Sequence, residues 1–173
     1  MGFREAELAD AYFYTDSCED LPLLEEVVAA GSDDGITHYR LYFCRRAAGA
    51  SDATAALESA RNLLEREVAS AKGFEAAFYL SNTYTSLGMN DRVAGLATDV
   101  IDRFEAGEIA EPVEAVEQFR LGKLDNDQGR ELDAEPWFSK AVEGFAAAAE
   151  TRNAPYLEWT ARWLGQRALA DER

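Results

Sequence analysis

The sequence contains few of the residues from which metal, redox and nucleophilic sites are built. Only one histidine and two cysteines occur among its 173 residues. Cys18 and Cys44 lack a CxxC spacing, and two cysteines are too few for a disulfide scaffold, so we expect reduced thiols. Because a zinc site would have to gather His38, both cysteines and a carboxylate from separate segments, we expect neither a metal nor a cofactor.

Long apolar runs are also lacking. No run approaches the roughly 18 apolar residues that are needed to cross a bilayer. The stretch from Met1 to Ala11 carries acidic side chains and has no basic segment followed by an apolar one, which is unlike a secretory signal peptide. We therefore expect no membrane association and a cytoplasmic protein.

Positive charge is scarce, since 17 basic side chains stand against 33 acidic ones and the formal net charge is −16. Such a field repels the phosphates of nucleic acids, so we predict no nucleic-acid partner. The acidic residues are spread over solvent faces, as at Glu65 and Glu67, and form no acid/base pair. The run 125–129 departs from a calcium loop because its glycine falls fifth and Pro136 stands twelfth. We predict a protein without enzymatic activity.

The residues that are abundant favour helices. The chain has 31 alanines, and apolar residues recur at helical spacing, as at Leu57, Ala60 and Leu64. Glycines stand at the far ends of such segments, as helix C-caps do, at Gly31, Gly49, Gly88, Gly107 and Gly129. No alternating run rich in Val, Ile and Thr indicates a strand. We predict an all-α fold with helices near 3–14, 21–30, 35–48, 52–70, 74–87, 91–106, 112–127, 132–150 and 155–170.

An internal repeat links two parts of the chain. One copy contains the residues Leu121, Gly122, Gly129, Ala134, Phe138 and Ala141. The other has the same spacing 41 residues earlier, at Leu80, Ser81, Tyr84, Gly88, Val93, Ala97 and Val100. In physical terms Gly122 and Ala134 would let two helices approach closely, Gly129 would make the turn and Phe138 would occupy the gap to the next hairpin.

This spacing of small and large residues resembles the tetratricopeptide repeat (TPR). The resemblance implies antiparallel helical hairpins that stack as a short right-handed α-solenoid in one domain, 1–173. The better repeats are 74–106 and 112–150, the degenerate hairpins are 3–30 and 35–70, and the terminal helix is 155–170. An irregular helical bundle stays open as the alternative, because any antiparallel helical packing can produce such spacings.

In the TPR family the first helix of each hairpin lines a concave groove. The resemblance places these residues in such a groove: Phe78, Tyr79, Asn82, Phe119, Arg120, Lys123 and Asn126. The degenerate repeat and the last helix would add His38, Tyr42, Arg45, Trp159, Arg162 and Trp163. An aromatic and basic surface suits an acidic peptide or a free C-terminal carboxylate. The alternative is that the Arg stems only cover apolar surface.

The last expected helix has apolar residues on two faces. Leu157, Ala161, Leu164 and Ala168 form one stripe, which is suited to packing on the preceding hairpin. Tyr156, Trp159 and Trp163 form a second, here called the aromatic stripe. The aromatic stripe either curls into the groove or meets another chain, for example in an end-to-end homodimer, because such residues often anchor interfaces.

These patterns favour a protein-protein interaction module that binds a peptide or helix of a partner protein. A structural subunit of a larger assembly is the second hypothesis, with the groove incidental. An all-α enzyme or small-ligand sensor with a pocket inside the superhelix is the third.

Overall fold

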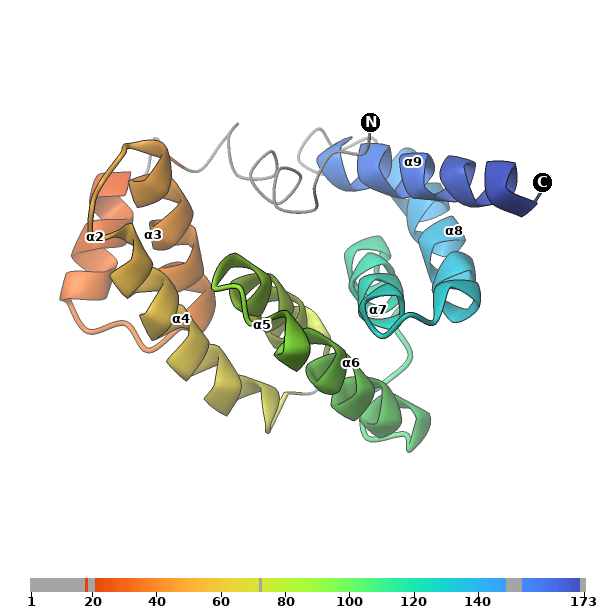
Figure 1. The fold of residues 1–173 in the computed structure, drawn as a ribbon, viewed down its shortest axis with the longest axis horizontal. Coiled ribbons are helices and arrows are strands. Elements are labelled where there is room, and N and C mark those ends of the chain that lie inside the picture. The colour runs from red at the N-terminus through yellow and green to blue at the C-terminus, as the bar shows by residue number, and fades with distance from the viewer. Residues whose placement is uncertain (1–17, 19–20, 72, 149–153, 172–173) are drawn as a thin grey trace. The chain divides into compact units, whose positions relative to one another are not determined.

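The computed structural model describes residues 18, 21–71, 73–148 and 154–171, and every regular element within these ranges is an α-helix (Figure 1). The helices are α2 (Leu21–Ala29), α3 (Gly35–Ala47), α4 (Ala53–Val68), α5 (Glu75–Ser86), α6 (Asn90–Glu105), α7 (Ala115–Asp127), α8 (Glu131–Ala148) and α9 (Ala154–Asp171). The all-α prediction is confirmed for this part of the chain. The helix expected at 3–14 lies outside the described residues.

Helix ends follow the predicted glycines. Gly129 has φ of +83°, a left-handed conformation that only glycine adopts at little cost. Its N–H donates to the carbonyl of Asn126 at 2.9 Å, and the Arg130 N–H donates to the carbonyl of Asp125 at 2.9 Å. This is the Schellman C-cap, and the other four predicted glycines also have positive φ. The C-cap prediction is therefore confirmed at all five positions.

The chain divides into two compact units. Unit 1 comprises Met1–Ala71 and Ala76–Arg92, and unit 2 comprises Lys72–Glu75 and Val93–Arg173. Helices α2, α3 and α4 and most of α5 belong to unit 1, whereas most of α6 and all of α7, α8 and α9 belong to unit 2. The expected single solenoid domain stays a prediction.

The core of unit 1 is built around α3, which packs against α2 and α4. Tyr39 and Leu41 on α3 are buried, as are Leu57 and Leu64 on α4. The two helices approach closely at Gly35, where an added Cβ would lie 2.6 Å from the Cγ of Leu64. Helix α3, the first helix of the α3/α4 hairpin, is therefore covered by two neighbouring helices.

The core of unit 2 is the hairpin of α7 and α8, with α9 packed mainly on α8. Gly122 lies against the second helix of the hairpin, because an added Cβ would lie 2.9 Å from two ring atoms of Phe138. Ala134 and Phe138 are fully buried. The structure thus confirms the close approach of a second helix at Gly122, but Phe138 makes the contact there, where the sequence analysis expected Ala134.

Candidate functional site

The predicted groove residues of α5 lie mainly in the core of unit 1. Phe78 and Tyr79 are buried, and Asn82 is half-buried. The Tyr79 ring meets the Tyr39 ring edge-on, with 5.3 Å between centroids. Two of these three side chains therefore contribute to packing.

The predicted groove cations of α7 are held by carboxylates of unit 2. Arg120 is only 7% exposed, and its guanidinium bonds to Glu75 at 2.5 Å and to Glu117. The Lys123 ammonium donates to Asp127, one turn further along α7. An anionic ligand would have to compete with these internal carboxylates.

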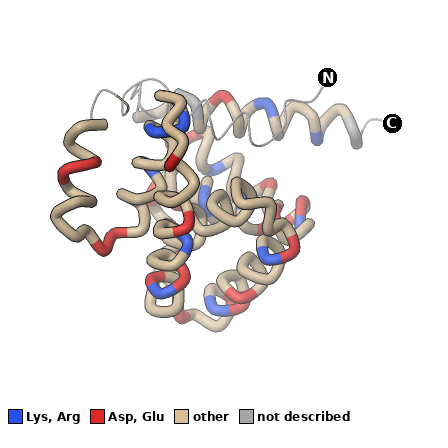
Figure 2. The backbone as a smooth tube through the Cα atoms, turned by 60° about the vertical axis from the view of Figure 1, so that its left-hand side comes forward, with Lys and Arg blue, Asp and Glu red and all other residues tan. Residues whose placement is uncertain are grey.

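The other expected cations of the groove have carboxylate partners too. Arg45 pairs with Glu25 at 3.2 Å, and Arg162 pairs with Glu158 at 2.7 Å. Figure 2 shows basic positions close to acidic ones along the helices. His38, which was also expected in the groove, is buried, and its Nε2 lies 3.0 Å from the Ser32 carbonyl oxygen.

The aromatic stripe of α9 contacts aromatic residues of the α7/α8 hairpin. Tyr156 meets Phe119 with 5.0 Å between ring centroids, and Trp163 meets Phe138 at 4.8 Å. The Trp163 Nε1–H also donates to the Asn126 Oδ1 at 3.1 Å. The sequence analysis expected this stripe either to curl into the groove or to meet another chain. In the described residues it contacts α7, the first helix of the α7/α8 hairpin.

The packing face predicted for α9 holds only in part. Leu157 and Leu164 are half-buried, whereas Ala161 and Ala168 are exposed, so the aromatic stripe takes a larger share of the packing than expected. The physical reason is size, because rings bury more apolar area than alanines when they pack on Phe119 and Phe138. A homodimer through the aromatic stripe stays a prediction.

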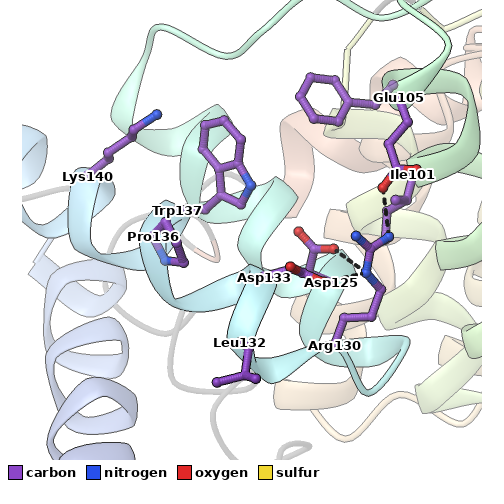
Figure 3. A pocket seen from close by; sticks show the side chains of 10 residues that line it. Ile101, Glu105, Asp125, Arg130, Leu132, Asp133, Pro136, Trp137 and Lys140 are labelled. Atoms are coloured by element: carbon purple, nitrogen blue, oxygen red, sulfur yellow. Dashed lines mark hydrogen bonds and ion pairs between the residues drawn. The ribbon is translucent and has the colours of Figure 1, made fainter.

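Unit 2 also contains a cavity of about 290 Å³ that the sequence analysis did not anticipate. Side chains from α6, from α8, and from the end of α7 and the turn after it surround this cavity (Figure 3). They are Ile101, Phe104, Glu105, Asp125, Arg130, Leu132, Asp133, Pro136, Trp137 and Lys140. Pro136 lies inside α8, and because it has no N–H it cannot donate to the carbonyl of Leu132 one turn earlier.

Charged groups converge at one end of the cavity. Arg130 bonds through Nη1 to Glu105 at 3.0 Å and through Nε to Asp133 at 2.8 Å (Figure 3). These hydrogen bonds raise the pKa of Arg130, which stays a cation. At the other side the Lys140 ammonium lies 4.2 Å from the centroid of the Trp137 ring.

Asp125 is the most enclosed charged group of the cavity. It is 3% exposed, and its Oδ1 has no hydrogen-bond partner within the described residues. The nearest guanidinium atom, Arg130 Nε, lies 3.6 Å from this oxygen, which is too long for a hydrogen bond. Burial raises the pKa of Asp125 to about 6, against the smaller lowering effect of Arg130.

This raised pKa predicts a pH-dependent effect of Asp125→Asn on stability. In the unfolded chain Asp125 loses its proton near pH 4, but in the native state only near pH 6, so ionisation costs stability as the pH rises between these values. We expect the free energy of unfolding of Asp125→Asn to exceed that of wild type by about 2–3 kcal/mol above pH 7, and the two values to be similar at pH 4. Urea unfolding at pH 4, 5, 6 and 7.5 measures this difference. Glu105, Asp133 and Arg130 are present in both proteins, so the comparison isolates the change at Asp125. A difference that is constant with pH would contradict the assignment.

The sequence analysis treated Asp125 only as part of a turn. The feature that could have marked it as unusual is its place in the internal repeat, where it corresponds to Tyr84, 41 residues earlier. A buried carboxylate at the position of a tyrosine departs from the packing role that the repeat assigns to this position.

Comparison with known proteins provides no family assignment, since no protein-family model, curated protein or solved structure matches the chain. Among the described residues no helix has the length and apolar content required to span a bilayer.

Proposed function

We propose that the chain is a TPR-like, non-enzymatic interaction module that binds a peptide or helix of a partner protein. The hairpin geometry supports this proposal. Gly122 allows the close helix contact expected of such repeats, Ala134 is buried, and α3 packs against both α2 and α4. The step from this architecture to protein binding is an analogy with the TPR family.

The observation that carries the proposal is the way in which α7 and α8 bind α9. The hairpin accepts a helix through ring contacts at Phe119 and Phe138 and one hydrogen bond from Trp163 to Asn126. Helix-in-groove recognition uses such aromatic anchors together with a few fixed polar groups. Beside them, Lys123 is the cation that we propose for contact with an acidic group of the partner.

The experiment begins with capture of partners by the tagged full chain from an extract of its source cells. Captured proteins are identified by mass spectrometry, and each is then purified and its affinity measured at two salt concentrations. A chain that binds no purified candidate would contradict the proposed function.

Neutralising the Lys123 pair tests the acidic contact. The double variant Lys123→Met, Asp127→Asn removes both charges, so that no buried carboxylate is left unpaired. We expect partner affinity to fall roughly tenfold and to depend less on salt, because one charge pair with the partner is lost.

A matched control is available on α4, where Arg61 and Glu58 form a surface ion pair at 3.0 Å. The variant Arg61→Met, Glu58→Gln should bind like wild type. Equal affinities for all three proteins would rule out the acidic contact at Lys123 while leaving peptide binding itself in place.

A further inference from the structure

We propose that the cavity between α6 and α8 binds an organic cation, namely a guanidinium or ammonium group on a short aliphatic stem. This site is distinct from the α7 surface to which the proposed protein partner is assigned. The inference does not depend on that proposed function.

The first argument is the unusual buried side chain of Asp125 in the lining of the cavity. At the corresponding position of the other repeat copy, Tyr84 is buried and its hydroxyl donates to Glu65 at 2.9 Å. Asp125 is equally buried but much smaller than tyrosine, so it leaves room where an aromatic ring would pack. A side chain selected for packing would not place a carboxylate here, because burial of a charge is costly and the ion pair with Arg130, at 3.6 Å, includes no hydrogen bond.

The second argument is the hydrogen-bonding capacity of Asp125. Its Oδ1 makes no hydrogen bond among the described residues, and the Arg130 Nε stays 3.6 Å away. The Asp125 side chain lines the cavity with its Oδ1 enclosed, so a ligand N–H that entered the cavity would supply the missing donor once the carboxylate turned toward it. Guanidinium and ammonium groups are well suited, because they carry several donors and no acceptor.

The third argument is the sign of charge around the cavity. Three carboxylates, those of Glu105, Asp125 and Asp133, face two cations. The Arg130 cation is already engaged with Glu105 and Asp133, and Lys140 lies over Trp137 and 3.6 Å from Glu111. The unsatisfied charge is therefore negative, which favours a cationic ligand over an anionic one.

The remaining walls fit the aliphatic stem. Phe104 and Trp137 meet edge-on, with 6.0 Å between ring centroids, and Ile101 is buried beside them in the lining. Aromatic faces attract cations and pack well against methylene groups. A cavity of about 290 Å³ is large enough for one long basic side chain or a small amine.

The same chemistry could come from an arginine side chain of a peptide or from a free amine. Two probes distinguish these sources: N-acetyl-L-arginine amide and agmatine. N-acetyl-L-citrulline amide is the neutral control, because it has nearly the same shape as the arginine probe and no charge. Titrations use the full chain at pH 7.5 and follow the NMR signal of the Trp137 indole N–H, which Trp137→Phe identifies.

We expect saturable shifts of the Trp137 signal with at least one cationic probe and none with citrulline amide. Asp125→Asn should weaken binding at least tenfold, whereas Asp99→Asn, an exposed position on α6 outside the lining, should leave it unchanged. Stronger binding of the arginine probe would assign the site to a peptide, and stronger binding of agmatine to a free amine.

Three results would overturn the inference. These are no saturable shift with either cation, equal binding of the citrulline probe, or unchanged affinity in Asp125→Asn. Circular dichroism of each variant confirms that the fold is retained. None of these results bears on partner binding at Lys123, so this inference and the proposed function can fail separately.

Discussion

Replacing Gly122 by leucine is expected to lower the free energy of unfolding by about 3 kcal/mol. The first added atom, Cβ, would already lie 2.9 Å from the Phe138 ring and 3.2 Å from the Trp137 Cβ. Phe138 cannot move aside easily, because it is fully buried and its ring contacts those of Trp159 and Trp163. Urea unfolding followed by circular dichroism measures the loss.

Gly95 provides the matched control. It lies on α6, and an added Cβ there would meet nothing within 4 Å. Gly95→Leu should therefore be neutral or slightly stabilising, since leucine favours the helix more than glycine does. Gly107 is unsuitable as a control because its φ of +77° strains any other residue. Equal urea midpoints for Gly122→Leu and wild type would contradict the close contact of α7 with α8.

Reversing the charge of Arg120 is expected to destabilise the protein by roughly 3 kcal/mol, since breaking a buried ion pair leaves uncompensated charge. Arg120→Glu would place a third carboxylate beside Glu75 and Glu117 at a position that is 7% exposed. Glu117 also accepts the Phe74 N–H at 3.1 Å, so its displacement would affect a second contact. Arg120 therefore belongs to an internal ion-pair cluster with Glu75 and Glu117, and we expect its removal to lower stability before it changes binding.

The cause of this loss can be tested by a neutral substitution. If repulsion among the three carboxylates dominates, Arg120→Gln, which adds no carboxylate, should lose less stability than Arg120→Glu. Arg162→Glu is the control, since Arg162 pairs with Glu158 on an exposed face of α9 and should change stability by less than about 0.5 kcal/mol. An Arg120→Glu variant that unfolds at the wild-type urea concentration would contradict the ion pairs of this residue.

The local features of the fold were predictable from the sequence. Helix ends are coded by single residues, as at Gly129, where a positive φ requires glycine. The close approach of a second helix at Gly122 was also predictable, because a repeated spacing of small and large residues reflects the distance between two packed helices, but the residue that it meets there, Phe138, was not.

The partners of charged and aromatic side chains were not predictable. Arg120 pairs with Glu75, which is 45 residues away, and no periodicity encodes that distance. Whether the aromatic stripe of α9 curls into the groove or meets another chain was left open, because helical projection gives two faces but not their order of burial. The cavity escaped prediction for another reason, since its lining comes from α6, α8 and the end of α7, and spacing along the chain does not show how these segments meet.

The division into two units has a spectroscopic consequence. All three tryptophans of the chain, Trp137, Trp159 and Trp163, belong to unit 2. Intrinsic tryptophan fluorescence therefore reports the unfolding of that unit alone, while far-ultraviolet circular dichroism reports the helices of both. Coincident transitions in the two signals would indicate that the units unfold as one cooperative system, and separate transitions would give each unit its own stability.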